Sequence, residues 1–332
     1  MKILITLPRG EVFDRHFPPH IIRRLEKLGS IVYNETGRQL TEEEMKEKLA
    51  DVQIVLTHWG TKQITGEVLD HAPELKIMAH CAGTVAHIAS EAFYERGIPV
   101  LSANSVMAEY VAESVLAYML SALHCVPEAN REMHEGRWNK PRGQVKPLLG
   151  AEIGLIGLGT VGRNLLRLLR PFRCRVYVYD PYLPEGALDE WEFAESCSFE
   201  QAMSRGIVSV HAAQTPETYH MISAKALSMI PDGGLFVNTS RGSLVDTEAL
   251  IEEMKTGRIS AALDVYEKEG PGGVPEALYG ISRNLLLQPH AAALAVSWQM
   301  TDQIIDDLER FLRGENLRLQ VPLSQYRLMT QE

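Results

Sequence analysis

The stretch Gly154-Leu155-Ile156-Gly157-Leu158-Gly159-Thr160-Val161-Gly162 decides the fold. It contains the pattern Gly-x-Gly-x-x-Gly, which alone is weak evidence because glycines also serve ordinary turns. Here an apolar strand precedes the pattern, and a leucine-rich amphipathic helix follows it until Pro171. In that context Gly157 makes the tight turn, Gly159 lets the backbone approach a pyrophosphate, and Gly162 lets helix and strand pack closely. The stretch predicts a dinucleotide-binding βαβ unit.

An acidic residue follows at the distance that this unit requires. Asp180 ends the next predicted strand, Arg175–Tyr179, 23 residues after Gly157. A carboxylate there accepts hydrogen bonds from a ribose 2′-hydroxyl. It also repels a 2′-phosphate, by about 4 kcal/mol at ~4 Å and an effective dielectric constant near 20. Neither Lys nor Arg stands immediately beside it. We therefore predict NAD (NADH) as cofactor rather than NADP; the alternative for Asp180 is an Asp-Pro turn.

Short apolar runs alternate with amphipathic segments on both sides of this unit. Strands are expected near Lys2–Leu7, 30–33, 53–57 and 75–79, and again near 153–156, 175–179, 207–211, 235–238 and 260–263. Thr41-Glu42-Glu43-Glu44 is a capping box that begins a helix. Strands that alternate with helices predict an α/β fold built of parallel βαβ units.

Three further segments complete the chain. A long apolar helix is predicted over Val106–Val126, and an irregular polar segment over Pro127–Pro147. A last helix is expected from Ser297 to Arg313, with Gly314 as its cap. No stretch approaches the ~20 apolar residues of a membrane span, so we expect no membrane partner.

Composition narrows the class of protein. The chain has 332 residues, 33 Lys and Arg against 43 Asp and Glu, and a formal net charge of −10. That balance argues against a nucleic-acid binder, which needs a basic face. The four cysteines form no CxxC or Cys/His pattern, so no metal site is expected. The N-terminal apolar run is too short for a secretory signal, which favours a cytoplasmic protein.

Three side chains that suit hydride chemistry follow the dinucleotide unit. Arg241 comes just after an apolar strand and could hold a substrate carboxylate. His290 follows another apolar run and could move the hydroxyl proton. Glu269 lies in the loop between them. Taken singly, each has an ordinary alternative: a surface arginine, a buried structural histidine and a solvated loop acid.

At this point the sequence resembles the D-isomer-specific 2-hydroxyacid dehydrogenase family over nearly its whole length. The resemblance rests on the Gly157–Gly162 pattern with Asp180, and on the segments Val111-Ala112-Glu113, Thr215-Pro216-Glu217-Thr218, Asn238–Gly242, Leu263–Glu269 and Pro289-His290. It implies that Arg241 binds the substrate carboxylate and carbonyl, that His290 is the general acid/base, and that Glu269 pairs with His290 and stabilises its protonated form.

The resemblance also implies the remaining site residues. Asp264 matches a residue at the nicotinamide end, and His211 and Thr215 match positions on the phosphate side. The loop of Cys81, Ala82 and Gly83 matches the substrate loop, whose backbone N–H groups meet the carboxylate. The cofactor-binding candidates are Gly157, Gly159, Thr160, Val161, Gly162, Asp180, His211, Thr215, Thr239 and Asp264.

The family implies two Rossmann-like domains, with the substrate in the cleft between them. The expected flavodoxin-like substrate domain covers residues 1–100 and 297–332, and the NAD-binding domain, 101–296, is inserted into it. The expected function is NAD-dependent interconversion of a D-2-hydroxy acid and its 2-oxo acid by a homodimer. The alternative is an NAD(H)-sensing, partner-binding protein of the co-repressor type with little catalysis. Trp59, Arg131 and Trp138 could line the substrate pocket, pack structurally or meet a second subunit.

Overall fold

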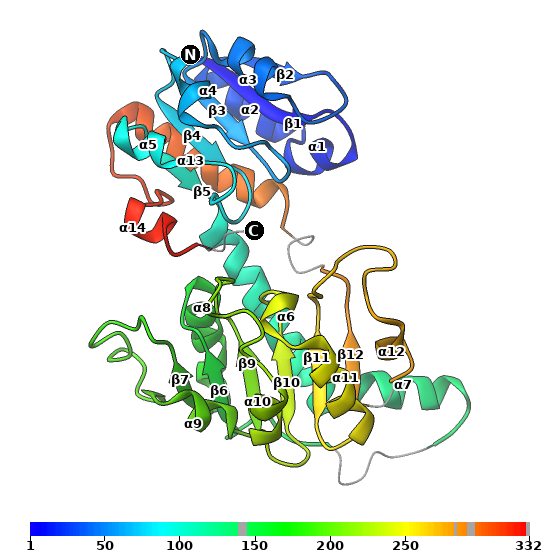
Figure 1. Cartoon of the computed structure of the whole chain (residues 1–332). Helices are drawn as coiled ribbons and strands as arrows, with labels where there is room; N and C mark the ends of the chain where they lie inside the picture. Colours follow the sequence, from blue (N-terminus) through cyan, green and yellow to red (C-terminus); the bar gives the residue numbers. More distant parts are fainter. Residues whose placement is uncertain (139–144, 282–283, 291–295, 330–332) are drawn as a thin grey trace. The chain divides into compact units, whose positions relative to one another are not determined.

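The computed structural model describes residues 1–138, 145–281, 284–290 and 296–329. The chain divides into two compact units. Unit 1 consists of Met1–Met107 and Ala293–Glu332, and unit 2 of Ala108–Ala292. Each contains one sheet in which every described strand pair is parallel, with helices around it (Figure 1). The predicted α/β fold is therefore confirmed.

Unit 1 is built on a five-stranded sheet in the order β2-β1-β3-β4-β5, which is flavodoxin-like. Its strands are β1 (Lys2–Pro8), β2 (Ser30–Asn34), β3 (Ile54–Thr57), β4 (Ile77–His80) and β5 (Val100–Ser102). Its helices are α1 (Glu11–His16), α2 (Pro19–Leu28), α3 (Glu42–Leu49), α4 (Gly66–Asp70), α5 (Glu91–Glu95), α13 (Trp298–Arg313) and α14 (Leu323–Tyr326).

Helix ends in unit 1 follow the local chemistry of the sequence. The Thr41 hydroxyl accepts the N–H of Glu44, and the Glu44 carboxylate accepts the N–H of Thr41, so the predicted capping box is present. Helix α13 ends at Gly314, whose φ of 69° suits a residue without Cβ. This helix belongs to unit 1 although it begins 191 positions after Met107, the last residue of the N-terminal part of that unit.

One arginine ties α13 to α2. The Arg24 guanidinium contacts Asp302 at 2.6 Å, Asp306 at 2.7 Å and Glu309 at 2.7 Å. The three acids lie on one face of α13, because their spacing is close to one turn. A planar guanidinium with several donors suits such a network. The contact therefore fixes the C-terminal helix to the N-terminal part of unit 1.

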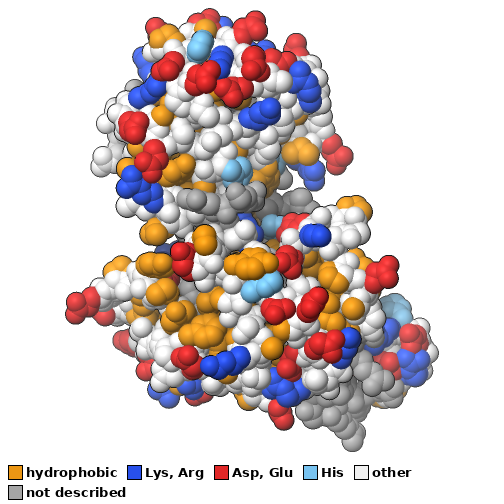
Figure 2. Space-filling model, viewed as in Figure 1, with side chains coloured by type: hydrophobic (Ala, Val, Ile, Leu, Met, Phe, Trp, Pro, Cys, Tyr) orange, Lys and Arg blue, Asp and Glu red, His pale blue; other side chains and the backbone are white. Residues whose placement is uncertain are grey.

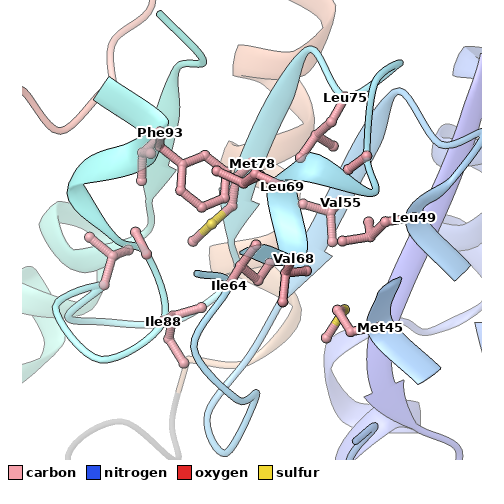
Figure 3. Packing of buried hydrophobic residues seen from close by; sticks show 14 of the residues in the cluster. Met45, Leu49, Val55, Ile64, Val68, Leu69, Leu75, Met78, Ile88 and Phe93 are labelled. Atoms are coloured by element: carbon pink, nitrogen blue, oxygen red, sulfur yellow. The ribbon is translucent and has the colours of Figure 1, made fainter. Parts of the chain in front are cut away.

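A hydrophobic cluster fills one face of the unit 1 sheet. Val55 and Met78 from the strands meet Met45, Leu49 and Phe93 from the covering helices (Figure 3). All five are at most 2% exposed. Burial of one such side chain contributes about 1.5–3 kcal/mol. Consecutive apolar residues in these strands are buried on both faces, as parallel sheets require.

Unit 2 is built on a seven-stranded sheet in the order β12-β11-β10-β9-β6-β7-β8. Its strands are β6 (Glu152–Ile156), β7 (Arg175–Tyr179), β8 (Ala194–Ser196), β9 (Ile207–Val210), β10 (Leu235–Asn238), β11 (Ser260–Leu263) and β12 (Leu285–Leu287). Its helices are α6 (Asn104–Leu123), α7 (Val126–His134), α8 (Thr160–Leu169), α9 (Phe199–Met203), α10 (Ala224–Met229), α11 (Thr247–Thr256) and α12 (Glu276–Tyr279), with short 3₁₀ turns η1 (Arg170–Phe172) and η2 (Gly242–Leu244).

The strand order of unit 2 reverses between β6 and β9. Strands β7 and β8 follow β6 on one side of this point, and β10, β11 and β12 follow β9 on the other. In open α/β sheets, ligands bind outside the carboxyl ends of the strands at such a switch point. Separate hydrophobic clusters cover the two faces, one with α6 and α8 and the other with α10 and α11. The sheet edge that holds the loops after β6, β9, β10 and β11 is therefore where a ligand site is expected.

The long helix predicted over Val106–Val126 is shorter, and part of the segment expected to be irregular is helical. Helix α6 ends at Leu123, and Cys125 adopts a left-handed conformation with φ of 51°. Helix α7 then begins at Val126, with Pro127 in its first turn, a position that proline favours. The sequence pattern missed this break because Cys125 is a residue type that rarely marks one.

Helix α6 is 20 residues long, and its most apolar window has a mean hydropathy of 1.3, enough by length and composition to cross a membrane. The expectation that no stretch approaches such a span was wrong in that respect. Its residues Ala112, Val115, Met119 and Leu123 lie in a hydrophobic cluster of unit 2. Core helices of proteins without any membrane segment pass the same test, so this property is weak evidence for a span.

Candidate functional site

The glycine-rich loop connects β6 to α8. Gly157 has φ of 92°, and a Cβ there would lie 2.7 Å from the backbone nitrogen of Ala212. A Cβ at Gly162 would lie 2.9 Å from the carbonyl oxygen of Gly157. At Gly159 a Cβ would meet nothing within 4 Å. The first and third glycines therefore allow close backbone packing, whereas the second leaves open space at the N-terminus of α8.

Asp180 lies directly against this loop. Its Oδ2 accepts the N–H of Leu158 at 2.8 Å, and its Oδ1 accepts the N–H of Tyr182 at 2.9 Å. These bonds fix the carboxylate at the end of β7, beside the loop that follows β6. The structure thus brings Asp180 together with the glycine loop, including Thr160 and Val161 in the first turn of α8.

The loop after β9 closes another side of this region. His211 lies close to Gly157, because Gly157 packs against the peptide that joins His211 to Ala212. The Nε2 of His211 is 2.8 Å from Ser209 Oγ, and burial lowers the pKa of His211 to about 4, so the ring is neutral. The N–H of Thr215 donates to Thr218 Oγ1 at 2.8 Å, which closes a short polar turn.

Two buried polar atoms at the ends of β10 and β11 lack a partner in the described part of the chain. They are Thr239 Oγ1 and Asp264 Oδ1. Their residues are 8% and 1% exposed. An unpartnered buried polar atom costs about 1–3 kcal/mol, which a bound polar group would relieve. These atoms and the open space at Gly159 fit a dinucleotide with a polar amide at one end.

Asp264 is the most perturbed acid of this region. Burial raises the pKa of its carboxyl group to about 6, while the charge of His290 and a hydrogen bond from Tyr118 act in the opposite direction. The Tyr118 hydroxyl lies 3.5 Å from Asp264 Oδ2. Burial in turn raises the pKa of Tyr118 to about 12. Asp264 therefore lies close enough to His290 to be influenced by its charge.

The predicted histidine–glutamate pair is formed. His290 Nδ1 lies 3.1 Å from Glu269 Oε2, and the side chains are 42% and 44% exposed. The two residues come from the loops after β12 and β11, which are neighbours in the sheet. The contact uses one ring nitrogen, so Nε2 is the atom that remains for a proton transfer.

Arg241 precedes η2, at the carboxyl end of β10. Its Nη1 donates to the Ser240 carbonyl at 2.7 Å, and it forms no ion pair with any described carboxylate. The next residue, Gly242, is packed so closely that its Cβ would lie 1.9 Å from the carbonyl carbon of Tyr266. The loop that carries Arg241 is therefore in direct contact with the loop that carries Glu269.

The proposed substrate loop lies in unit 1, after β4. The N–H of Cys81 donates to the Thr57 carbonyl at 2.9 Å, so this N–H already has an acceptor. Cys81 is 0% exposed, and burial raises the pKa of its thiol to about 12. The N–H groups of Ala82 and Gly83 have no acceptor among the described residues. Two of the three expected donors thus have an N–H without an acceptor in the part of the chain that the structure describes.

Three distinctive residues have separate surroundings. Trp59 is 38% exposed and its ring meets His58 edge-on at 4.8 Å and His16 at 6.0 Å. Arg131 lies on α7, in which the structure shows no buried residue, and Trp138 follows that helix with 75% exposure. Among the described residues, no group of three or more His, Cys, Asp or Glu could hold a metal ion.

One cavity of unit 2 lies elsewhere. It has a volume of about 780 Å³ and lies at the amino ends of β10 and β11, where Gly233, Leu235 and Ser260 line it. This is the sheet edge opposite to the glycine loop, Arg241 and Glu269. On the visible surface of both units, acidic and basic side chains are intermixed (Figure 2). The glycine loop, Arg241 and Glu269 therefore lie at the carboxyl edge of the sheet and not at this cavity.

Comparison with known proteins gives the same family as the sequence motifs. The family described as D-isomer specific 2-hydroxyacid dehydrogenase, NAD binding domain, matches residues 116–292. A glyoxylate reductase of Thermococcus litoralis is 30% identical over 312 residues, which are 91% of this chain and 93% of that protein. A D-3-phosphoglycerate dehydrogenase of Methanocaldococcus jannaschii is 32% identical over 325 residues, and the chain spans 58% of its length.

A solved structure is similar over almost the whole chain. A phosphoglycerate oxidoreductase from Rhizobium etli has a TM-score of 0.80 and 25% identity, and the match covers 97% of this chain and 99% of that one. The chain belongs to the D-isomer-specific 2-hydroxyacid dehydrogenase family, and residues 116–292 match its NAD-binding domain.

Proposed function

We propose that this protein interconverts a D-2-hydroxy acid and its 2-oxo acid with NAD(H). The observation that carries the proposal is the contact of 3.1 Å between His290 and Glu269. It lies at the same sheet edge as the glycine loop and the unpartnered side-chain atoms of Thr239 and Asp264. A proton-transferring pair beside a dinucleotide cradle is what hydride transfer to a carbonyl carbon needs.

His290 is the acid and base of this reaction. In reduction, NADH when bound supplies the hydride to C2 of the oxo acid. The protonated imidazole gives its Nε2 proton to the carbonyl oxygen, and the hydroxy acid forms. In oxidation the neutral imidazole accepts the hydroxyl proton. Glu269 favours the protonated ring through its negative charge and fixes its orientation.

Arg241 of unit 2 holds the substrate, and the loop after β4 of unit 1 offers further hydrogen-bond donors. The guanidinium of Arg241, which has no described carboxylate partner, binds the substrate carboxylate and polarises its carbonyl group. In the loop after β4, the N–H groups of Ala82 and Gly83, which have no acceptor among the described residues, can donate to a carboxylate. Cys81 contributes no backbone donor, because its N–H is used within the fold.

The cofactor is held by the glycine loop and by Asp180. The N-terminus of α8 offers N–H groups to the pyrophosphate. The Asp180 carboxylate is held beside the loop and accepts the ribose hydroxyls, which favours NAD over NADP. His211 and Thr215 would border the phosphate side of the cofactor, and Asp264 would contact its nicotinamide end. The Thr239 hydroxyl, which has no partner among the described residues, would also contact the cofactor.

The test is NADH oxidation, followed by absorbance, against a panel of 2-oxo acids. The panel contains glyoxylate, hydroxypyruvate, larger aliphatic and aromatic acids, and a phosphorylated acid. Turnover by the natural chain that disappears in His290→Ala and persists in His71→Ala, a change of an exposed histidine, supports the proposal. If no acid is turned over while NADH binds tightly, the NAD(H)-sensing alternative replaces it.

We further propose a cytoplasmic homodimer. All four cysteines are free thiols, as a reducing compartment favours. Helix α7 exposes Val126 and Met133 by 51% and 52%, and Trp138 follows it. Such side chains are enriched at protein interfaces. Sedimentation at micromolar concentration tests this assembly: a monomer there contradicts it, and Met133→Lys should weaken a dimer held by α7.

A further inference from the structure

Glu267 accepts hydrogen bonds from three residues on two other segments of unit 2. Its Oε1 is 3.2 Å from the Tyr219 hydroxyl and 3.1 Å from His220 Nε2. Its Oε2 is 3.1 Å from the Thr247 hydroxyl. Tyr219 and His220 precede α10, and Thr247 begins α11. One carboxylate thus joins three segments, and hydrogen bonds to an ionised group are the stronger kind.

The loop that carries Glu267 has no regular secondary structure of its own. It runs from the end of β11 to α12 without a regular element, and it contains two glycines with positive φ, Gly270 and Gly272. Such a segment needs side-chain anchors to keep one conformation. Glu269 lies only two residues after Glu267, on the exposed side of this loop.

Tyr266, the neighbour of Glu267, contacts the segment that carries His290. The Tyr266 hydroxyl donates to the carbonyl of Gln288 at 2.8 Å, two residues before His290. The peptide that joins Tyr266 to Glu267 also packs against Gly242, the neighbour of Arg241. The dipeptide Tyr266–Glu267 is therefore the point where the segments of Arg241, Glu269 and His290 meet.

The partner of Glu267 is itself held in an unusual backbone conformation. His220 has φ of 50°, in the left-handed region that non-glycine residues seldom adopt. Its ring stacks on that of Tyr219 at 3.9 Å, and its N–H donates to the Ser243 carbonyl at 2.9 Å. A residue keeps such a conformation only where its surroundings fix it. The contacts around Glu267 are therefore rigid enough to position the loop.

We propose that Glu267 is a positioning residue for the Glu269–His290 pair: it fastens the loop after β11 to α11 and to the segment before α10, and so keeps Glu269 against His290. The inference rests on the proposed function, because it concerns the same reaction. Glu267 does not touch the substrate. Instead, Glu267 raises the fraction of time for which His290 Nδ1 and Glu269 Oε2 stay in contact at 3.1 Å.

The experiment compares Glu267→Ala with Glu267→Gln. Alanine removes all three hydrogen bonds, whereas the glutamine oxygen keeps an acceptor, and its amide can meet the Tyr219 hydroxyl or a neutral His220 ring. We expect kcat for 2-oxo acid reduction to fall by about tenfold in Glu267→Ala, a part of the roughly 10²- to 10⁴-fold that general acid–base catalysis contributes. Glu267→Gln should restore most of it.

The pH profile separates positioning from mere stability. In Glu267→Ala the pH at which reduction halves should move lower, towards its value in Glu269→Gln, and the double variant should move no further. Binding of NADH should not change. The matched control is Glu248→Ala, an exposed acid on α11 beside Thr247. If Glu267→Ala lowers the melting temperature but leaves kcat and the pH profile unchanged, the proposal is wrong.

Milder variants and a second readout keep the test decisive. If Glu267→Ala does not fold, Tyr219→Phe and Thr247→Val each remove one hydrogen bond and should give a smaller shift in the same direction; no shift in either overturns the proposal. NMR titration of the His290 ring needs no turnover. An unchanged titration in the variants overturns the positioning role, whereas a natural chain that reduces no oxo acid contradicts only the proposed function.

Discussion

His290 Nδ1 lies 3.1 Å from Glu269 Oε2, although the two residues are 21 positions apart and belong to the loops after different strands. The strands β12 and β11 are paired in parallel, with Leu263 opposite Leu287. Parallel pairing brings their carboxyl ends to one edge, which places both loops there. The contact is therefore a product of the sheet order, and the two side chains remain accessible enough to meet a substrate.

Glu269→Gln should move the pH dependence of 2-oxo acid reduction to lower pH. The negative charge of the carboxylate attracts a positively charged imidazolium, and the neutral amide does not. Initial rates with NADH from pH 5 to 9 measure the shift, and an unmoved profile argues against the pair.

Asp264→Asn should stabilise the cofactor-free protein at high pH. Burial raises the pKa of Asp264 to about 6, above its value in an unfolded chain. Its ionised form therefore destabilises the fold, by nothing below about pH 4 and fully above about pH 6. The variant removes up to about 3 kcal/mol of this cost at pH 8. Urea unfolding at pH 8 and pH 4 measures it.

The same variant should bind NADH more weakly if the carboxylate meets the nicotinamide amide. A gain of stability at pH 4 as large as at pH 8 would show that the effect is not the ionisation of Asp264. A loss of stability at pH 8 would contradict the raised pKa itself. Tyr118→Phe is a useful companion, because it removes the one described hydrogen bond to the Asp264 Oδ2 atom.

The sequence predicts the fold well where a local pattern determines the structure. The glycine loop, the capping box at Thr41 and the cap at Gly314 depend on residues a few positions apart, so their geometry can be inferred without knowledge of the rest of the chain. The family resemblance adds the pair of His290 and Glu269, which no local pattern contains. The structure shows that pair in contact; the roles of its members remain proposals.

Contacts between distant segments could not be predicted. Glu267 stands in the same quoted segment as Glu269, but its three partners come from 20 to 48 positions away. The end of α6 at Leu123 was also missed, because Cys125, which adopts the left-handed conformation after it, is a residue type that rarely marks a helix end. Likewise, the N–H of Cys81 is taken by Thr57, which depends on the pairing of β3 with β4. Each of these depends on sheet order or on backbone conformation.

Asp180→Asn should narrow the preference for NADH over NADPH. Asparagine is nearly isosteric and its oxygen can still accept the N–H of Leu158, but it no longer repels a 2′-phosphate. The repulsion is about 4 kcal/mol per unit charge at ~4 Å and an effective dielectric constant near 20. We expect kcat/KM for NADPH to rise at least tenfold and that for NADH to fall. If kcat/KM falls equally with NADH and NADPH, Asp180 only maintains the structure of the loop and does not select the cofactor.

Arg241→Lys should weaken substrate binding and leave NADH binding unchanged. Lysine keeps the charge but loses the planar pair of donors that matches a carboxylate. Loss of one charge-assisted hydrogen bond costs about 1.5–3 kcal/mol, so kcat/KM for the oxo acid should fall by about 10- to 100-fold. Arg38→Lys, at an exposed ion pair of unit 1, is the control. A variant as active as the natural chain would remove Arg241 from the site.

Acid should destabilise unit 1 through three buried histidines. Burial lowers the pKa of His16 to about 4 and that of His80 to about 3, and it holds the pKa of His58 well below its ordinary value. The neutral rings stabilise the fold above about pH 6.5. As the pH falls towards 4, these histidines bind protons in the unfolded chain but not in the folded one. The free energy of unfolding therefore decreases.

Each such histidine makes the free energy of unfolding fall by about 1.4 kcal/mol per pH unit, so three together give about 4 kcal/mol per unit. Urea unfolding between pH 6.5 and 4.5 measures this slope. His58→Gln removes one of the three titrations and should flatten it by about a third, whatever its effect at pH 7. His71→Gln alters an exposed histidine and should leave the slope as it is. An equal slope in both variants would show that the buried rings do not control the acid stability of unit 1.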